Sequence, residues 1–460
     1  MAKRMLVVLF VLALVAAACS SDDSSDTTTT ADTGGETTTT TTAAPDETTT
    51  TAAPAEGDVT LRWRTRPDND QEAGVYQNVS DSLQGSLDGV TLQYEAGGTE
   101  TEGYQQALLT QLSAGEAPDV FWIPGADIAE FASKGVIYNL APLANADDTF
   151  QFEDFYPGPM EQMTTDPATG QSDPANYLWG LPRDVSAFAL YMNLDLIAEA
   201  GADDPRELAE AGTWDWAAFT EVSEAIAALD TEIFGYGQSS WWGPVGWWLN
   251  SAGGGFFNEA RDACGLDTPE SIEGLAAFRD FFAGGSGFTY GEDPEPVFKA
   301  GNIGMFQNGR WATPGIREVD FNWDVVKLPD GPGGPSNWLF WGAYVVNANT
   351  ENPQAAWDLV KALTSAEVQA QVAELGANIP SRVSQDALDA FLTFTPPENN
   401  QAFLDGLGEN PVTEAPLWNG DWPSYRDEMN TRVNAVVTGD LSIEEYEANI
   451  CTDLNQYFDN

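Results

Sequence analysis

Residues 90–125 read VTLQYEAGGTETEGYQQALLTQLSAGEAPDVFWIPG, and this stretch indicates the fold class. Aliphatic and aromatic residues alternate with polar ones at 90–94, which predicts a strand. Residues 104–114 have helical spacing and stop at a glycine, and residues 119–123 form a short strand, apolar after its first residue, that a Pro-Gly pair ends. A strand, a helix and a second strand in this order are typical of an α/β domain with a mostly parallel sheet.

The same alternation continues along the chain. Further strands are predicted at 59–64, 187–192 and 343–346, and further helices at 73–87, 216–229, 271–282 and 352–363. About 400 residues follow this pattern without a second linker, so we expect two lobes that share one chain. Ligands of open α/β sheets bind beyond the carboxyl ends of the strands, which directs attention to the residues there.

The composition excludes several classes of function. The chain has 460 residues, 42% of them hydrophobic, which is enough to bury a large core. It carries 18 Lys and Arg against 72 Asp and Glu, a formal net charge of -54, and such a field opposes nucleic-acid binding. It has no histidine, which removes Ser-His-Asp and Cys-His catalysis and His-ligated metals.

The N-terminus is typical of an exported lipoprotein. Residues 1–18 combine two early basic residues with an apolar run that is too short to span a bilayer, as in a signal peptide. Cys19 follows directly, where a bacterial lipobox places the cysteine that receives lipid; an ordinary secretory signal is the alternative. Residues 19–57 are rich in threonine and acid, so we expect a disordered tether.

The other two cysteines are predicted to form a disulfide. If Cys19 takes lipid, Cys264 and Cys451 remain, and an oxidising compartment favours their pairing. Two separate buried thiols are the alternative.

Several segments together resemble the family 1 extracellular solute-binding proteins, the sugar-capturing subunits of bacterial ABC importers. The segments that carry the resemblance are APDVFW at 117–122, GVIYNLAPL at 135–143, WGLPR at 179–183, LYMN at 190–193, FKAGNIGM at 298–305 with Trp311, WG at 341–342 and NIPSR at 378–382. Each is weak alone, and their order over residues 58–460 carries the resemblance.

The resemblance implies a two-lobed periplasmic-binding-protein-like fold of type II, in which each lobe has a mixed, mostly parallel sheet flanked by helices and a hinge joins the lobes. The first lobe would hold 58–186 and 330–377, and the second 187–329 and 378–460. The function implied is capture of a sugar or oligosaccharide and its delivery to an ABC permease, by a monomer anchored through lipid to the outer face of the cell membrane. A polyamine or peptide ligand, or a secreted carbohydrate-active hydrolase or lyase, is the alternative.

Aromatic residues are the first candidates for the ligand site, because sugar rings present apolar faces that stack on flat side chains. By position or by family resemblance they are Trp122, Trp241, Trp242, Trp311, Trp341 and Trp422. Polar candidates follow predicted strands or crossings, where charged groups can bind hydroxyls. They are Arg64, Arg66, Asp68, Glu95, Arg183, Asp184 and Arg382.

We expect no cofactor, no metal and no catalytic residue. The local acid cluster of Glu292, Asp293 and Glu295 lacks calcium-loop spacing and reads as a solvated surface. The tether holds eight of the acids and the leader two of the basic residues, so the body from residue 58 keeps a net charge of -48. This suggests a surface adapted to salty surroundings.

Overall fold

The computed structural model describes residues 59–67, 69–98, 103–374, 376, 378–408, 411–414 and 416–458. The chain divides by its contacts into two units, 1–53 and 54–460, and every described residue belongs to the second. The predicted signal peptide, Cys19, the tether and Asp68 lie outside the described residues.

The larger of two main sheets has seven strands. Its order is β12 (Ile379–Pro380), β6 (Leu181–Ser186), β11 (Asn337–Val346), β3 (Val120–Pro124), β1 (Val59–Thr65) and β2 (Val90–Ala96), and β13 (Pro411–Thr413) also pairs with β11. β1 runs parallel to β2 and β3, and β13 runs parallel to β11. β11 is antiparallel to β3 and β6, so the sheet is mixed.

The smaller sheet has the order β10 (Trp323–Val326), β7 (Phe188–Asn193), β9 (Ile303–Gly309) and β8 (Phe234–Gln238). The α/β class with mixed sheets is confirmed. Parallel pairing is less general than the sequence suggested, because in this sheet only β8 and β9 run parallel. A parallel pair needs a long crossover, and here the helices between β8 and β9 provide one. A separate hairpin joins β4 (Thr165–Asp166) and β5 (Gln171–Ser172).

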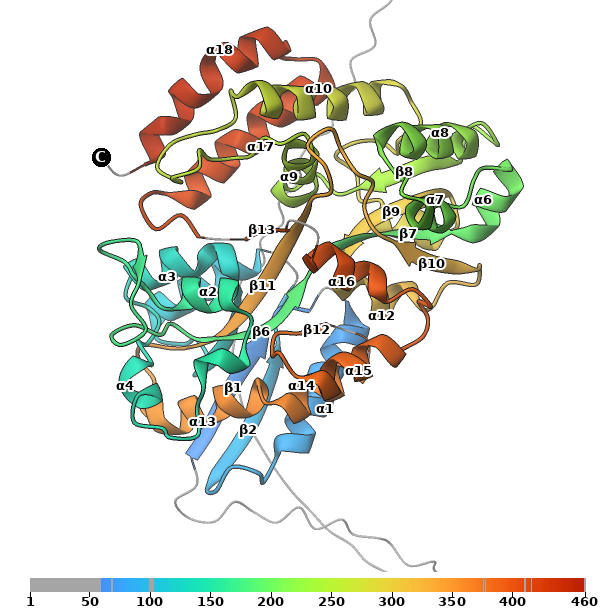
Figure 1. Cartoon of the computed structure of the whole chain (residues 1–460). Coiled ribbons are helices and arrows are strands. Elements are labelled where there is room, and N and C mark those ends of the chain that lie inside the picture. Colours follow the sequence, from blue (N-terminus) through green and yellow to red (C-terminus); the bar gives the residue numbers. More distant parts are fainter. Residues whose placement is uncertain are drawn as a thin grey trace, which may run out of the picture. The chain divides into compact units, whose positions relative to one another are not determined.

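Helices gather in two groups around the two sheets (Figure 1). With the larger sheet go α1 (Asp70–Leu83), α2 (Tyr104–Ala114), α3 (Ile128–Ser133), α4 (Ala141–Ala144), α5 (Pro157–Met163), α13 (Pro353–Leu363), α14 (Ala366–Glu374) and α15 (Gln385–Thr393). With the smaller go α6 (Leu194–Ala200), α7 (Pro205–Ala211), α8 (Trp216–Ala227), α9 (Trp242–Ser251), α10 (Pro269–Ala283), α11 (Glu295–Lys299), α17 (Trp422–Thr438) and α18 (Ile443–Leu454). α12 (Thr313–Ile316) follows β9 of the smaller sheet and contacts α1 of the other group. α16 (Gln401–Gly408) contacts strands of both sheets.

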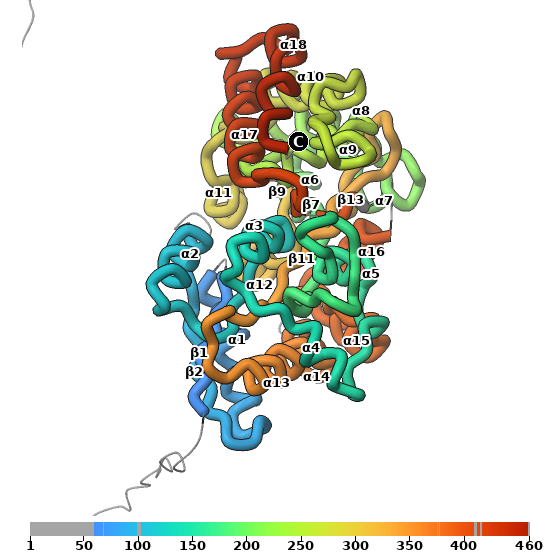
Figure 2. The backbone as a smooth tube through the Cα atoms, turned by 90° about the vertical axis from the view of Figure 1, so that its left-hand side faces the viewer, coloured from blue at the N-terminus to red at the C-terminus, as the bar shows by residue number. Residues whose placement is uncertain are grey.

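Segments of the C-terminal third of the chain pack in both groups of helices. Figures 1 and 2 both show α17 and α18 beside α10, at the end of this unit remote from β1 and β2. α15 packs instead against α14, and β12 pairs with β6. The segment after residue 378, expected in the second lobe, therefore begins beside the larger sheet and reaches the smaller one later.

The chain first passes between the sheets at a single residue. β6 ends at Ser186 and β7 begins at Phe188, so Ala187 alone connects them, and it is fully buried. The sequence placed the end of the first lobe at 186. The chain passes between the sheets a second time between β10 and β11. β11 starts at Asn337 and pairs with both β6 and β3 in the larger sheet.

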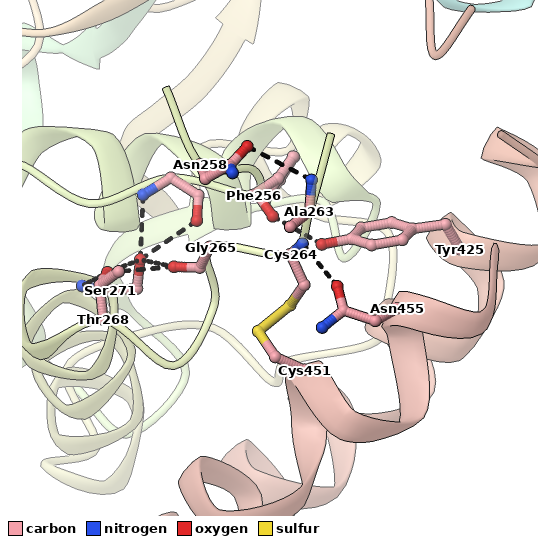
Figure 3. Close-up of a disulfide and its surroundings, with 11 residues drawn as sticks. Phe256, Asn258, Ala263, Cys264, Gly265, Thr268, Ser271, Tyr425, Cys451 and Asn455 are labelled. Carbon is pink, nitrogen blue, oxygen red and sulfur yellow. Dashed lines mark hydrogen bonds between the residues drawn. A yellow bond between two sulfur atoms is a disulfide. The ribbon is translucent and has the colours of Figure 1, made fainter. Parts of the chain in front are cut away.

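Cys264 and Cys451 form the predicted disulfide, with their Cα atoms 5.2 Å apart (Figure 3). Cys451 lies on α18, and the backbone N–H of Cys264 donates to Asn455 Oδ1 over 2.9 Å. The bond ties the loop before α10 to the last helix, within the group around the smaller sheet. Of the described helices, none has the length and apolarity that crossing a bilayer would need.

Candidate ligand-binding cavity

A cavity of about 510 Å³ is lined by residues of both sheets and of the loops and helix ends next to them. From the larger sheet, the ends of β1, β3 and β6 and the middle of β11 contribute to its wall. The other side is formed by the loop after β8, the start of α9, the C-terminal end of β9, residues 291–295 up to the first residue of α11, and the start of α17. Strand ends that meet at one edge leave their backbone and side chains open to a ligand, as the rule for open α/β sheets predicts.

Nine of the sequence-predicted residues line this cavity. They are Arg66, Trp122, Arg183, Asp184, Trp241, Trp242, Trp311, Trp341 and Trp422. Gln105, Asn308, Phe340 and Glu414 also line it, and sequence reasoning missed them. Glu292, Asp293 and Glu295, read from sequence as a solvated acid run, are part of the wall as well.

Two tryptophans present the most open aromatic surface. Trp241 and Trp311 are half-buried, whereas Trp242, Trp341 and Trp422 are buried. The rings of Trp241 and Trp311 lie 5.6 and 5.7 Å from the ring of Phe340, so the three form a continuous wall. Flat aromatic side chains of this kind carry large apolar area for a ligand.

Two glycines make room for these indoles. A Cβ on Gly309 would stand 2.3 Å from the Trp311 ring, and one on Gly243 would stand 2.3 Å from the Trp241 ring. Each indole therefore lies against the backbone of a glycine two residues away. A side chain at either glycine would collide with the indole.

Trp122 has a different environment. The guanidinium carbons of Arg66 and Arg183 lie 4.6 and 4.8 Å from its ring centroid, which is cation–π distance. Its indole also lies over Gly342, where a Cβ would approach Nε1 to 2.1 Å. Trp122 thus holds two arginines at the wall, and little of its ring is open for stacking because only 5% of the residue is exposed.

Arg183 is balanced by buried acids. Its Nη2 lies 2.6 Å from Asp184 Oδ2, and its Nη1 lies 3.9 Å from Glu72 Oε1. Burial alone would lower the pKa of Arg183, but Asp184, Tyr76, Glu72 and Tyr344 together more than offset this, so its pKa is raised and the guanidinium stays charged. The pair therefore presents a fixed dipole at the wall, with donors and acceptors oriented before a ligand arrives.

Glu414 is a buried carboxyl group at the same wall. Its Oε1 accepts from Ala126 N over 3.0 Å, and its backbone oxygen accepts from Trp341 Nε1 over 2.6 Å. Burial raises the pKa of Glu414 to about 8, with the neighbouring Asp127 adding to the shift. Nothing in the sequence distinguished this glutamate among 72 acids, because its burial arises from contacts with residues far away in the chain.

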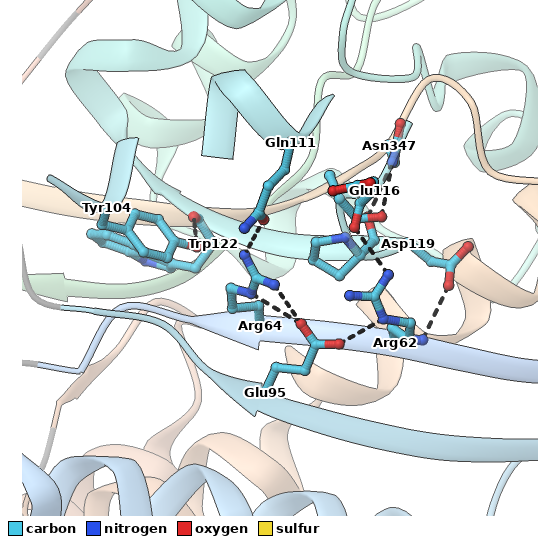
Figure 4. Close-up of polar contacts among 11 residues, drawn as sticks. Arg62, Arg64, Glu95, Tyr104, Gln111, Glu116, Asp119, Trp122 and Asn347 are labelled. Carbon is cyan, nitrogen blue, oxygen red and sulfur yellow. Dashed lines mark hydrogen bonds and ion pairs between the residues drawn. The ribbon is translucent and has the colours of Figure 1, made fainter. Parts of the chain in front are cut away.

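Arg64 and Glu95 lie outside the cavity, in a charge cluster on β1 and β2 (Figure 4). Glu95 accepts from Arg64 Nη2 over 2.5 Å and from Arg62 Nε over 2.6 Å, and Arg64 Nη1 donates to Gln111 over 2.6 Å. Burial alone would raise the pKa of Glu95, but the two arginines bring it below its ordinary value. These groups satisfy one another within the strands, so we leave them out of the ligand site.

Arg382 also lies elsewhere. Its Nη1 is 2.6 Å from Asp154 Oδ2, its Nε donates to Thr364 O over 2.6 Å, and its guanidinium stacks on Phe155. It borders a separate open hollow that Lys361 also lines. A basic group with these partners anchors the loop after β12 to α13 and its neighbours. Among the described residues, no group of three or more Cys, Asp or Glu side chains could hold a metal ion.

The chain resembles known binding proteins over most of its length. The maltotriose-binding protein of Pyrococcus abyssi is 24% identical over 64% of this chain and 60% of its own. The ABC substrate-binding protein of Listeria monocytogenes in complex with cycloalternan superposes with a TM-score of 0.75 and 19% identity, over 87% of this chain and 98% of that one. The GacH receptor of Streptomyces glaucescens, solved unliganded and with acarbose, has a TM-score of 0.73 and 20% identity, over 86% and 97%.

These structures confirm the two-lobed fold expected from the sequence. Residues 80–396, more than two thirds of the chain, match the family described as bacterial extracellular solute-binding protein. The chain belongs to the bacterial extracellular solute-binding protein family.

Proposed function

We propose that this protein captures a sugar or oligosaccharide outside the cytoplasm and delivers it to an ABC permease. The observation that carries the proposal is the cavity between the two sheets, with half-buried Trp241 and Trp311 on one wall and the Arg183–Asp184 pair on the other. Sugars have apolar C–H faces and a rim of hydroxyls, so they match a site built from flat aromatics and oriented charges. The cavity volume falls within the range of roughly 300–1,000 Å³ that small-molecule sites have.

The proposed ligand contacts follow from this wall. Trp241 and Trp311 stack on the sugar faces, with buried Phe340 packed between them, and Arg66, Arg183 and Asp184 bind hydroxyls. Trp122, Trp242, Trp341 and Trp422 support these groups from behind, since each is buried and in contact with another lining residue. Relatives that bind maltotriose, cycloalternan and acarbose support a saccharide ligand over a polyamine or a peptide.

Capture is proposed to occur by closure of the two lobes. The lobes are the groups around the larger and the smaller sheet, and they rotate about the connections at Ala187 and before β11. Closure that a ligand favours shifts an open–closed equilibrium, so the measured affinity includes the free energy of closing. The protein performs no chemistry on its ligand in this proposal.

Calorimetric titration of the full chain tests the ligand class. The panel is maltotriose, galacto-oligosaccharides, spermidine and a short neutral peptide, with reducing ends measured in parallel. Saturable binding of a saccharide without new reducing ends is expected. Binding of spermidine or the peptide alone would overturn the sugar assignment, and turnover would overturn the absence of catalysis.

We also propose that Cys19 carries the lipid that holds the protein at the outer face of the membrane, and that the monomer acts there. Mass spectrometry of the membrane-bound protein should find a lipid-modified N-terminal cysteine. Cys19→Ala should release the protein from the membrane fraction, and retention of that variant would contradict the anchor.

A further inference from the structure

Arg310 directly precedes the cavity tryptophan Trp311, yet its side chain points away from solvent altogether. The residue is 0% exposed and follows the last residue of β9, at the start of a short 3-10 turn, Arg310–Ala312. No ion pair joins it to any carboxylate among the described residues. A guanidinium buried without an acid is costly, so the surroundings must compensate for the lost water.

The compensation comes from the connection between α15 and α16. Arg310 Nη1 donates to Asn400 Oδ1 over 2.6 Å. Its guanidinium carbon lies 4.7 Å from the ring of Phe391, 5.2 Å from that of Phe394 and 5.4 Å from that of Phe403. Three aromatic rings around one desolvated cation are a strong cation–π arrangement. Burial lowers the pKa of Arg310 to about 10, so the group stays charged at neutral pH.

Asn400 is itself fixed to that connection. Its Nδ2 donates to the backbone oxygens of Phe394 and Pro397, the second over 3.0 Å. The amide nitrogen of Asn400 binds the backbone of the connection, and its amide oxygen binds Arg310. Arg310 is therefore hydrogen-bonded to a side chain that is itself bonded to the backbone of this connection.

The backbone of Arg310 is held on its other side by the first crossing between the sheets. Arg310 N donates to Ser186 Oγ over 3.1 Å, and Ser186 is the last residue of β6. Trp311, one residue on, lies 6.3 Å from the ring of Phe188, the first residue of β7. The turn that carries Trp311 is thus hydrogen-bonded on one side to Ser186, at the end of β6, and on the other side to Asn400, between α15 and α16.

We propose that Arg310 is a positioning residue of the ligand site, which fixes the orientation of the Trp311 indole by clamping its turn between Ser186 and the Phe391–Asn400–Phe403 cluster. The ligand-binding part of this inference rests on the proposed function. Arg310 touches no ligand in this scheme and acts through its neighbour.

Fluorine NMR of the full chain tests the positioning without any ligand. The protein is labelled with 5-fluorotryptophan, and the Trp311 resonance is identified by its absence in Trp311→Phe. Arg310→Met and the milder Arg310→Lys should each shift or split that resonance. The matched control is Arg317→Met, because Arg317 also stacks on Phe394, at 4.1 Å, but is exposed and lies six residues after Trp311 rather than next to it. An unmoved Trp311 resonance in both Arg310 variants would overturn the inference.

A double-variant cycle separates positioning from mere stability. Maltotriose is titrated into the parent, Arg310→Met, Trp311→Ala and the double variant. Arg310→Met should weaken binding roughly tenfold in the parent and hardly at all when Trp311 is already absent. An equal loss in both backgrounds would show a general structural role and overturn the inference. If maltotriose does not bind, the proposed function loses support, while the NMR experiment still decides the role of Arg310.

Discussion

The side-chain amide of Asn337 pairs with the backbone of Phe188 as a neighbouring strand would. Phe188 N donates to Asn337 Oδ1 over 3.0 Å, and Asn337 Nδ2 donates to Phe188 O over 2.8 Å. Phe188 opens β7 directly after the crossing at Ala187, and Asn337 opens β11. A buried side chain therefore links the two sheets at the point where the chain passes between them.

Asn337→Ala should lower the free energy of unfolding by about 2–4 kcal/mol. The change leaves Phe188 N and O without these partners in a buried place, and each unsatisfied group costs roughly 1–3 kcal/mol. Urea unfolding followed by circular dichroism measures the change. Asn349→Ala is the matched control, since that asparagine is exposed on the turn after β11. Equal midpoints for Asn337→Ala and the parent would contradict the role assigned to the amide.

Trp311→Ala should weaken saccharide binding by about 1–3 kcal/mol, because the indole is half-buried at the cavity and supplies stacking area. The affinity is measured by calorimetric titration with the tightest-binding saccharide of the panel. Trp418→Ala serves as the control, since Trp418 is also half-buried but does not line the cavity. Unchanged affinity in Trp311→Ala would remove this residue from the site.

Glu414 should make stability depend on pH in the direction opposite to an ordinary salt-bridged acid. Its pKa is about 8 in the folded chain, against an ordinary value of about 4.5. The folded state therefore keeps a proton that the unfolded state has lost, and stability falls as pH rises from about 4.5 to about 8. Below that range the contribution is fully present, and above it the contribution is lost.

Glu414→Gln should remove this slope, because an amide does not titrate. Urea midpoints of the parent and the variant are compared at pH 5, 7 and 8.5. The other acids are the same in both proteins, so their contribution drops out of the difference between the two midpoints. The parent should lose stability relative to the variant as pH rises. Glu447→Gln, an exposed change on α18, provides the control. A difference that is constant with pH would show that Glu414 is charged throughout.

Replacing both Cys264 and Cys451 with serine should lower the free energy of unfolding by about 2–5 kcal/mol, because the bond closes a long loop with a sequence separation of 187. Saccharide affinity should stay unchanged, because neither cysteine lines the cavity. Mass spectrometry without reduction should find no free thiol at either position in the parent. A free thiol at Cys264 would contradict the bond.

Salt should stabilise the protein strongly. The body from residue 58 carries a net charge of -48, and raising NaCl from about 0.1 M to about 1 M shortens the range of repulsion from about 10 Å to about 3 Å. The melting temperature should rise over this range. Sucrose at equal osmolality is the control, since it adds no ions. A flat response to NaCl would leave the acidity without this explanation.

Much of the fold followed from local pattern. Short apolar runs that alternate with helical spacing predicted strands at 59–64, 90–94 and 119–123 and the α/β class, and the structure has strands at 59–65, 90–96 and 120–124. Such runs are a local signal, because a buried strand needs apolar residues at consecutive or alternate positions. The same logic brought Arg66, Trp122 and Arg183 to one edge, since parallel strand ends meet there. The predicted export to an oxidising compartment likewise favoured the Cys264–Cys451 disulfide, which the structure contains.

Only the tertiary structure decided which charged group meets which partner. Arg64 and Arg66 are two residues apart, yet the first pairs with Glu95 inside the strands while the second reaches the cavity, because β1 ends between them. Glu414 and Arg310 are buried by segments 73 or more residues away. Sequence spacing encodes strand, helix and which face of each is apolar, and these are local properties. The partner of a buried charge depends on packing between distant segments, and that information exists only once the chain has folded.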